Sequence, residues 1–108
     1  MIEQVFPLLQ GPKRTVEKVV QDDNVDYIHM LFNNDEGLPL HYSNSNVYMT
    51  VLQGTLTIGL NDQGDHHYPA GTLLKIPYKI RMNVRNTHDE QLELIVVKAP
   101  APKNYPRS

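Results

Sequence analysis

Several features that define large protein classes are missing from this chain of 108 residues. It contains no cysteine, which excludes disulfides, thiolate metal sites and cysteine nucleophiles. No apolar run approaches the roughly 20 residues of a membrane-spanning helix. Basic residues form no cluster longer than Lys13-Arg14 and the net charge is −2, whereas nucleic-acid binding needs a concentrated basic face. We therefore expect neither a membrane protein nor a nucleic-acid-binding protein.

The composition is that of an ordinary globular domain. Hydrophobic residues make up 40% and charged residues 20% of the chain, which excludes intrinsic disorder. A chain of this length forms one domain that buries about two-thirds of its unfolded surface. Residues 1–4 lack the basic and apolar regions of a secretory signal, so we expect a cytoplasmic location.

Short β-branched and apolar segments alternate with turn residues along most of the chain. Period-two alternation is clear in residues 25–33 and 55–61, and such alternation is typical of strands. Other segments with strand composition are residues 15–21, 47–53, 65–68, 72–76, 81–86 and 92–98. We find no convincing helix, so the pattern predicts an all-β sandwich or barrel. We expect an N-terminal arm at 1–14, a barrel core at 25–98 and an extended C-terminal tail at 99–108.

The order of glycines, prolines and one histidine resembles that of the small single-domain cupins. His41 stands at the first histidine of their first motif, and Gly54 stands at its closing glycine. Gly71, Pro77 and Asn86 keep the spacing of the second motif. The resemblance covers roughly residues 25–98 and implies a cupin-type jelly-roll β-barrel, or double-stranded β-helix, within a single domain of residues 1–108.

The resemblance weakens where cupins bind metal. In that family, two histidines, a glutamate and a third histidine hold a divalent ion. The last three of these positions are Ser43, Val47 and Met82 here, so only His41 keeps a metal-binding side chain. Val47 has no donor atom and Met82 has only a weak thioether. We therefore expect the usual metal site to be absent, and with it the metal-dependent mechanisms of the family.

The same positions predict a ligand-binding pocket. Strand alternation places apolar side chains beside two polar groups, giving the predicted ligand-binding residues His41, Ser43, Val47, Met49, Met82 and Val84. These side chains could instead fill the barrel and leave no cavity. We expect a small-molecule-binding cupin of unknown ligand. The alternatives are a cupin enzyme of isomerase, dioxygenase or lyase type using His41 as acid or base, with a rearranged metal site or none, and a purely structural barrel.

A second metal hypothesis involves copper. If His29 faced the barrel interior opposite His41, two imidazoles and the thioethers of Met49 and Met82 would suit copper(I). Both faces of the strand that carries His29 bear apolar residues, so the alternation does not show which way the His29 side chain points. His66, His67 and His88 are expected on the surface.

Apolar residues near the amino terminus predict self-association. Val5, Phe6, Leu8 and Leu9 lie outside the cupin core segment. We expect them to lie against a partner subunit in a two-fold homodimer. The alternative is that they cover an edge of their own barrel.

Overall fold

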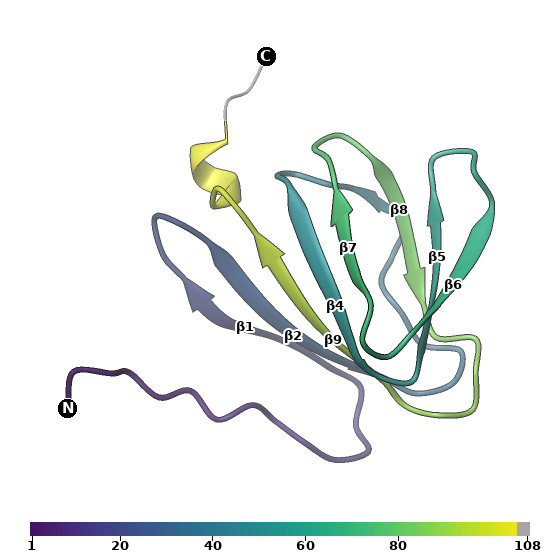
Figure 1. Ribbon diagram of the computed structural model, residues 1–108, viewed down its shortest axis with the longest axis horizontal. Helices are drawn as coiled ribbons and strands as arrows, with labels where there is room; N and C mark the ends of the chain where they lie inside the picture. Colours follow the sequence, from purple (N-terminus) through teal and green to yellow (C-terminus); the bar gives the residue numbers. More distant parts are fainter. Residues whose placement is uncertain (106–108) are drawn as a thin grey trace.

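The fold is all-β, as the sequence predicted. The computed structural model describes residues 1–105, and Figure 1 shows their arrangement. The strands are β1 Thr15–Gln21, β2 Asp26–Phe32, β3 His41–Tyr42, β4 Val47–Gln53, β5 Thr55–Leu60, β6 Asp65–Pro69, β7 Leu73–Ile76, β8 Arg81–Arg85 and β9 Leu92–Lys98. One short 3-10 turn, Pro102–Asn104, follows them. No helix of residues 1–105 is long and apolar enough to cross a membrane.

The strands form two antiparallel sheets that face each other. One sheet has the order β1-β2-β9-β4-β7 and the other β3-β8-β5-β6. Strands distant in the sequence are therefore neighbours, since β9 lies between β2 and β4, and β8 lies between β3 and β5. This order is that of a double-stranded β-helix, and Figure 1 shows the two sheets enclosing the interior.

Alternation along the strands decides which side chains enter the interior. On β2, Ile28, Met30 and Phe32 belong to the hydrophobic core. On β4, the core residues are Val47, Met49 and Val51. The core is completed by Leu56, Ile58, Ile76, Met82, Val84, Leu92, Leu94 and Val96. Adjacent residues point to opposite faces of a sheet, so the intervening residues of β2 lie on the outer face.

Gly54 permits the sharp turn between β4 and β5. Its φ is +78°, and a Cβ atom added there would lie 2.5 Å from the Gln91 carbonyl oxygen. Such a φ is unfavourable for residues that carry a side chain, and the close backbone approach leaves no room for one. The residue that matches the closing glycine of the cupin motif therefore has a conformational and a steric reason to be glycine.

The described part of the C-terminal segment is folded onto the barrel and is not a free extended tail. Ala101 is 1% exposed, and its amide donates a hydrogen bond to the Asn24 carbonyl at 2.9 Å. The Ser45 hydroxyl donates to the Pro100 carbonyl at 2.5 Å. The Tyr105 ring packs on Tyr78 with a centroid distance of 4.3 Å. Residues 106–108 of the predicted tail lie outside the described residues.

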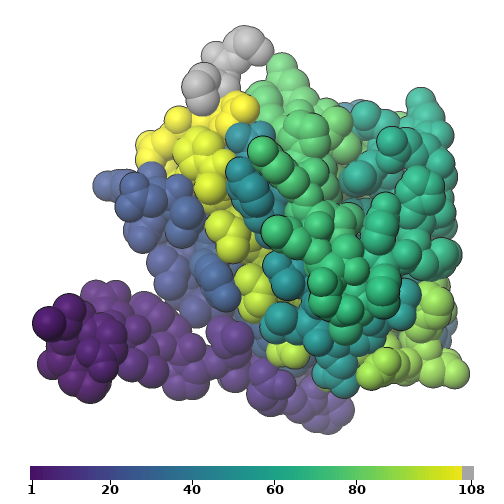
Figure 2. All heavy atoms as spheres, in the orientation of Figure 1, coloured from purple at the N-terminus to yellow at the C-terminus, as the bar shows by residue number. Residues whose placement is uncertain are grey.

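The N-terminal arm has two parts with different surroundings. Its second part is tied to the barrel, because the Leu9 amide donates to Glu17 and the Gln91 amide donates to the Gly11 carbonyl, at 2.9 and 2.8 Å. Its first part projects from the body of the molecule (Figure 2). Val5 there is 66% exposed and Phe6 is 47% exposed. The arm thus covers part of its own barrel and leaves other apolar residues uncovered.

Candidate ligand-binding cavity

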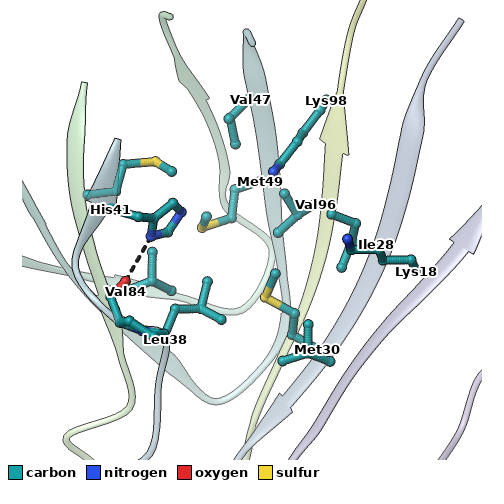
Figure 3. A pocket seen from close by; sticks show the side chains of 13 residues that line it. Lys18, Ile28, Met30, Leu38, His41, Val47, Met49, Val84, Val96 and Lys98 are labelled. Atoms are coloured by element: carbon teal, nitrogen blue, oxygen red, sulfur yellow. Dashed lines mark hydrogen bonds between the residues drawn. The ribbon is translucent and has the colours of Figure 1, made fainter. Parts of the chain in front are cut away.

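A cavity of about 280 Å³ lies between the two sheets. Figure 3 shows the side chains around it. Its walls are Val16, Lys18, Ile28, Met30, Leu38, Pro39, His41, Val47, Met49, Met82, Val84, Val96 and Lys98. Ten of these thirteen residues are apolar, and such walls with a few placed polar groups are typical of small-molecule sites. Its volume lies just below the usual range of roughly 300–1,000 Å³ for ligand pockets.

Five of the six predicted binding residues lie at this cavity. Val47 and Met49 reach it from β4, Met82 and Val84 from β8, and His41 from β3. Within each strand the two residues are separated by one position, so both point to the same face. The ladder pairs His41 directly with Met82, which places the histidine at the rim of the four-stranded sheet.

His41 presents one ring nitrogen to the cavity. Its Nδ1 lies 2.8 Å from the Pro39 carbonyl oxygen. A carbonyl only accepts, so Nδ1 carries a proton and donates it in this contact. In the neutral ring, Nε2 is then the unprotonated nitrogen with a free lone pair. Figure 3 shows this nitrogen on the cavity side, toward Met49, where it can accept a hydrogen bond from a ligand or take up a proton.

Two lysines at the cavity were missed by the sequence analysis. Lys98, at the end of β9, and Lys18, on β1, direct their side chains to the cavity in Figure 3. Burial lowers the pKa of the Lys98 ammonium; the Asp26 carboxylate opposes this effect and the Lys18 charge adds to it. A sequence signal did exist, because Lys98 lies two residues after Val96 and Lys18 two residues after Val16, which gives each pair the same face.

Ser43 has a structural environment. It is 3% exposed and does not belong to the cavity walls. Its hydroxyl donates to the Pro77 carbonyl at 2.7 Å and accepts a hydrogen bond from the Ile80 amide at 2.8 Å. Strand β3 ends at Tyr42, so the alternation that would have placed Ser43 beside His41 does not continue. Its hydrogen bonds hold the loop before β8 against the barrel.

The donors at the family's metal positions do not fit a divalent ion. Of those four positions, His41 supplies an imidazole, whereas Val47 supplies no donor and Met82 a thioether. The hydroxyl of Ser43 is already engaged in the loop contacts. Residues 1–105 contain no group of three or more histidine, cysteine, aspartate or glutamate side chains that could hold a metal ion.

The side chain of His29, whose direction the sequence left open, points away from the barrel interior. Ile28 and Met30 on either side point into the core, so His29 lies on the outer face of the five-stranded sheet. It is 0% exposed, and its Nδ1 and Nε2 each lie 2.7 Å from a carboxylate oxygen, of Glu17 and Glu93 respectively. The sheet therefore separates His29 from His41, and the proposed pair of imidazoles around copper(I) does not form.

The three remaining histidines are exposed, as predicted. His66 and His67 lie on β6 and His88 lies in the loop before β9. The Nδ1 atom of His67 is 3.3 Å from Nε2 of His88 and 3.0 Å from the Thr57 hydroxyl. This cluster lies on the sheet remote from Lys98 and contributes nothing to the cavity walls.

Comparison with known proteins identifies the family. No family model matches the chain. A Methanocaldococcus jannaschii protein, MJ0764, whose name describes it as uncharacterised, is 38% identical over 104 residues, which are 95% of this chain and 90% of that protein. The crystal structure of MJ0764, described as an RmlC-like cupin family protein with a double-stranded β-helix fold, superposes with a TM-score of 0.91 at 36% identity and 95% coverage of both chains.

More distant structures share the fold. The cupin domain of Schizosaccharomyces pombe Cnp3 superposes with a TM-score of 0.75 at 13% identity, covering 92% of this chain and 69% of that one. A cupin superfamily protein of Desulfitobacterium hafniense gives 0.73 at 14% identity, covering 86% and 83%. The strand order, the motif residues and the similarity to MJ0764 together show that this chain belongs to the RmlC-like cupin family.

Proposed function

We propose that this cupin binds a small, partly apolar molecule in the cavity between its sheets, without the metal ion that the family usually holds. The observation that carries the proposal is the cavity itself, because its apolar walls are interrupted by His41, Lys18 and Lys98. A ligand with an apolar body would cover the apolar walls and remove their surface from water, which favours binding. The donor set described above supports binding without a metal.

The methionines of the chain provide a direct test. Met30, Met49 and Met82 line the cavity, whereas the fourth methionine, Met1, is 100% exposed. Protein labelled with ¹³C at the methionine methyl groups would be titrated with small carboxylates, amides and amines. Binding in the cavity should shift the three cavity methyl signals in a saturable way and leave that of Met1 unchanged. If none of the three compound classes shifts them, the proposal is wrong.

Two neighbouring valines of β9 offer a matched pair of variants. Val96 lines the cavity, and Val97 points to the other face of the sheet. Val96→Phe should occupy the space and abolish the shifts, whereas Val97→Phe should retain them. Both melting temperatures would be measured, because added volume in a packed core costs about 1–3 kcal/mol. Equal binding by the two folded variants would contradict the proposal that the ligand binds in this cavity.

An enzymatic role for His41 is a second candidate. The Pro39 carbonyl orients the ring and leaves Nε2 available as an acid or base at the cavity. The protein would be incubated with a metabolite extract, and consumption of each compound would be followed by mass spectrometry. A compound consumed by the wild type and spared by His41→Ala, at similar melting temperature, would support catalysis. Consumption of none, or equal consumption by both proteins, would contradict it.

We also propose that two copies pair through the first part of the N-terminal arm. Its exposed apolar residues support this, as does a shallow groove beside the arm formed by Phe6, Leu8, Val19, Val20 and Tyr27. In a two-fold dimer each arm would cover the other copy. Light scattering should show a dimer for the wild type and a monomer for Phe6→Asp. The control is Leu73→Asp, which changes a 63% exposed leucine on β7; an unchanged dimer in Phe6→Asp would refute the pairing.

A further inference from the structure

The charges at the cavity are all of one kind. Its walls contain two lysines and one histidine and no aspartate or glutamate. In the part of the chain that the structure describes, neither Lys18 nor Lys98 forms an ion pair, whereas Arg81, Arg85 and Lys103 each pair with an aspartate. The Asp26 carboxylate lies opposite Lys98 in the ladder and acts on its ammonium, but Asp26 lies outside the cavity walls, at a surface depression with Lys103. The cavity therefore holds positive charge without a partner inside it.

We propose that the molecule bound in this cavity is a small carboxylate with an apolar body, and that its carboxylate group lies at the Lys98 ammonium. This inference rests on the function proposed above and specifies its ligand class. The Lys98 ammonium ends between Val47, Met49 and Val96 in Figure 3, inside the apolar walls. Charged groups in such surroundings interact more strongly than in water, because the local dielectric constant is lower.

The remaining features of the cavity limit the rest of the ligand. Lys18 is exposed on the edge strand β1, so its charge attracts an anion at the entrance. The volume of about 280 Å³ corresponds to the bulk-liquid share of about nine water molecules at ~30 Å³ each. That volume suits the apolar body of a short acid. The lone pair of Nε2 on His41 further favours an acid that carries a hydroxyl or amide hydrogen near its apolar part.

A pair of probes with the same shape isolates the charge. Hexanoate and hexanamide share their chain and differ in whether the head group is an anion. Each would be titrated into protein labelled at the methionine methyl groups, near neutral pH. We expect hexanoate to bind about tenfold more tightly, which corresponds to about 1.4 kcal/mol. Added salt should weaken hexanoate binding and leave hexanamide binding unchanged.

Lysine variants locate the anion. Lys98→Met keeps most of the side-chain volume and should bring hexanoate affinity down to that of hexanamide. Lys75→Met is the matched control, because Lys75 is an exposed lysine on β7 that contacts the Tyr48 ring and lies outside the cavity walls. It should retain the tenfold preference. A preference that survives in Lys98→Met overturns the assignment to that ammonium.

The outcomes also separate this inference from the function on which it rests. If hexanamide and hexanoate shift the cavity methyl signals with equal affinity, the site binds small molecules and the carboxylate class is wrong. If amines bind and hexanoate does not, the class is also wrong. If no probe of any class shifts Met30, Met49 or Met82, the binding function itself fails, and the ligand class fails with it.

Discussion

Replacing His29 by leucine should destabilise the protein strongly, because this residue joins three strands and two acids. The imidazole is fully buried, and its two nitrogens each lie 2.7 Å from a carboxylate, of Glu17 on β1 and Glu93 on β9. Each of the two contacts needs one proton to be a hydrogen bond, and a neutral imidazole has a single N–H. The imidazole and the two carboxyl groups must therefore hold two protons among them. The arm adds donors, because the Leu9 amide contacts Glu17 and the Gln10 amide contacts Glu93.

The magnitude follows from the burial of the trio. The side chains of Glu17 and Glu93 are 21% and 14% exposed, so in His29→Leu two largely buried carboxylates would face an apolar group. Breaking a buried charge pair by removing one partner costs roughly 3–5 kcal/mol, and the residual exposure of both acids places this variant at the lower end. A loss of about 3 kcal/mol corresponds to a fall in melting temperature of roughly 12–24 °C for a domain of this size.

Urea unfolding of four variants tests this reasoning. His29→Leu is compared with the triple variant His29→Leu/Glu17→Gln/Glu93→Gln, which removes the unpaired charges and should recover part of the loss. Glu90→Gln, in an exposed loop, is the control for removing a carboxylate. The double variant Glu17→Gln/Glu93→Gln completes a mutant cycle, because it gives the effect of the two acid substitutions while His29 is present. An unchanged free energy of unfolding in His29→Leu would refute the trio's role. No recovery in the triple variant would show that lost packing, and not unpaired charge, is responsible.

Two further predictions concern the buried Asn86 and the half-buried Lys98. Asn86→Ala should lower the free energy of unfolding by about 2 kcal/mol, measured by urea unfolding, because the buried amide donates to the Phe32 and Glu90 carbonyls at 3.0 and 2.9 Å; a loss below the experimental error would contradict it. Lys98→Met should be more stable than the wild type at neutral pH, because burial lowers the pKa of Lys98 from 10.5. Between the folded and unfolded pKa values of Lys98 the unfolded chain binds more protons than the folded chain, so the stability of the wild type rises with pH. The difference in free energy of unfolding between Lys98→Met and the wild type should therefore narrow toward pH 10.5. A difference that does not change with pH would contradict the prediction.

The sequence predicted the strands well, because their alternation is local and unambiguous. Residues 92–98 form β9 as predicted, and the strand predicted at residues 25–33 contains β2. His41 could be placed through the cupin motif. Ser43 could not be placed in the same way, because β3 has only two residues and alternation is informative only while a strand continues.

The direction of His29 could not be predicted because both faces of β2 are buried. Leu31, on the outer face with His29, is 1% exposed, as if it belonged to the core. The arm and the neighbouring strands cover this face, and such cover comes from contacts distant in the sequence. Lys18 and Lys98 were missed for a different reason, since lysine side chains in strands are usually taken as solvated.

The register of two strands explains why the cavity is positive. On β1, Glu17 and Lys18 are adjacent, so one points to His29 on the outer face and the other to the cavity. On β9, Glu93 and Lys98 are an odd number of residues apart, with the same result. A slip of one residue would exchange the faces, placing the acids in the cavity and the lysines beside His29. The pairing that holds the buried trio together therefore also turns Glu17 and Glu93 away from the cavity, while Lys18 and Lys98 face it.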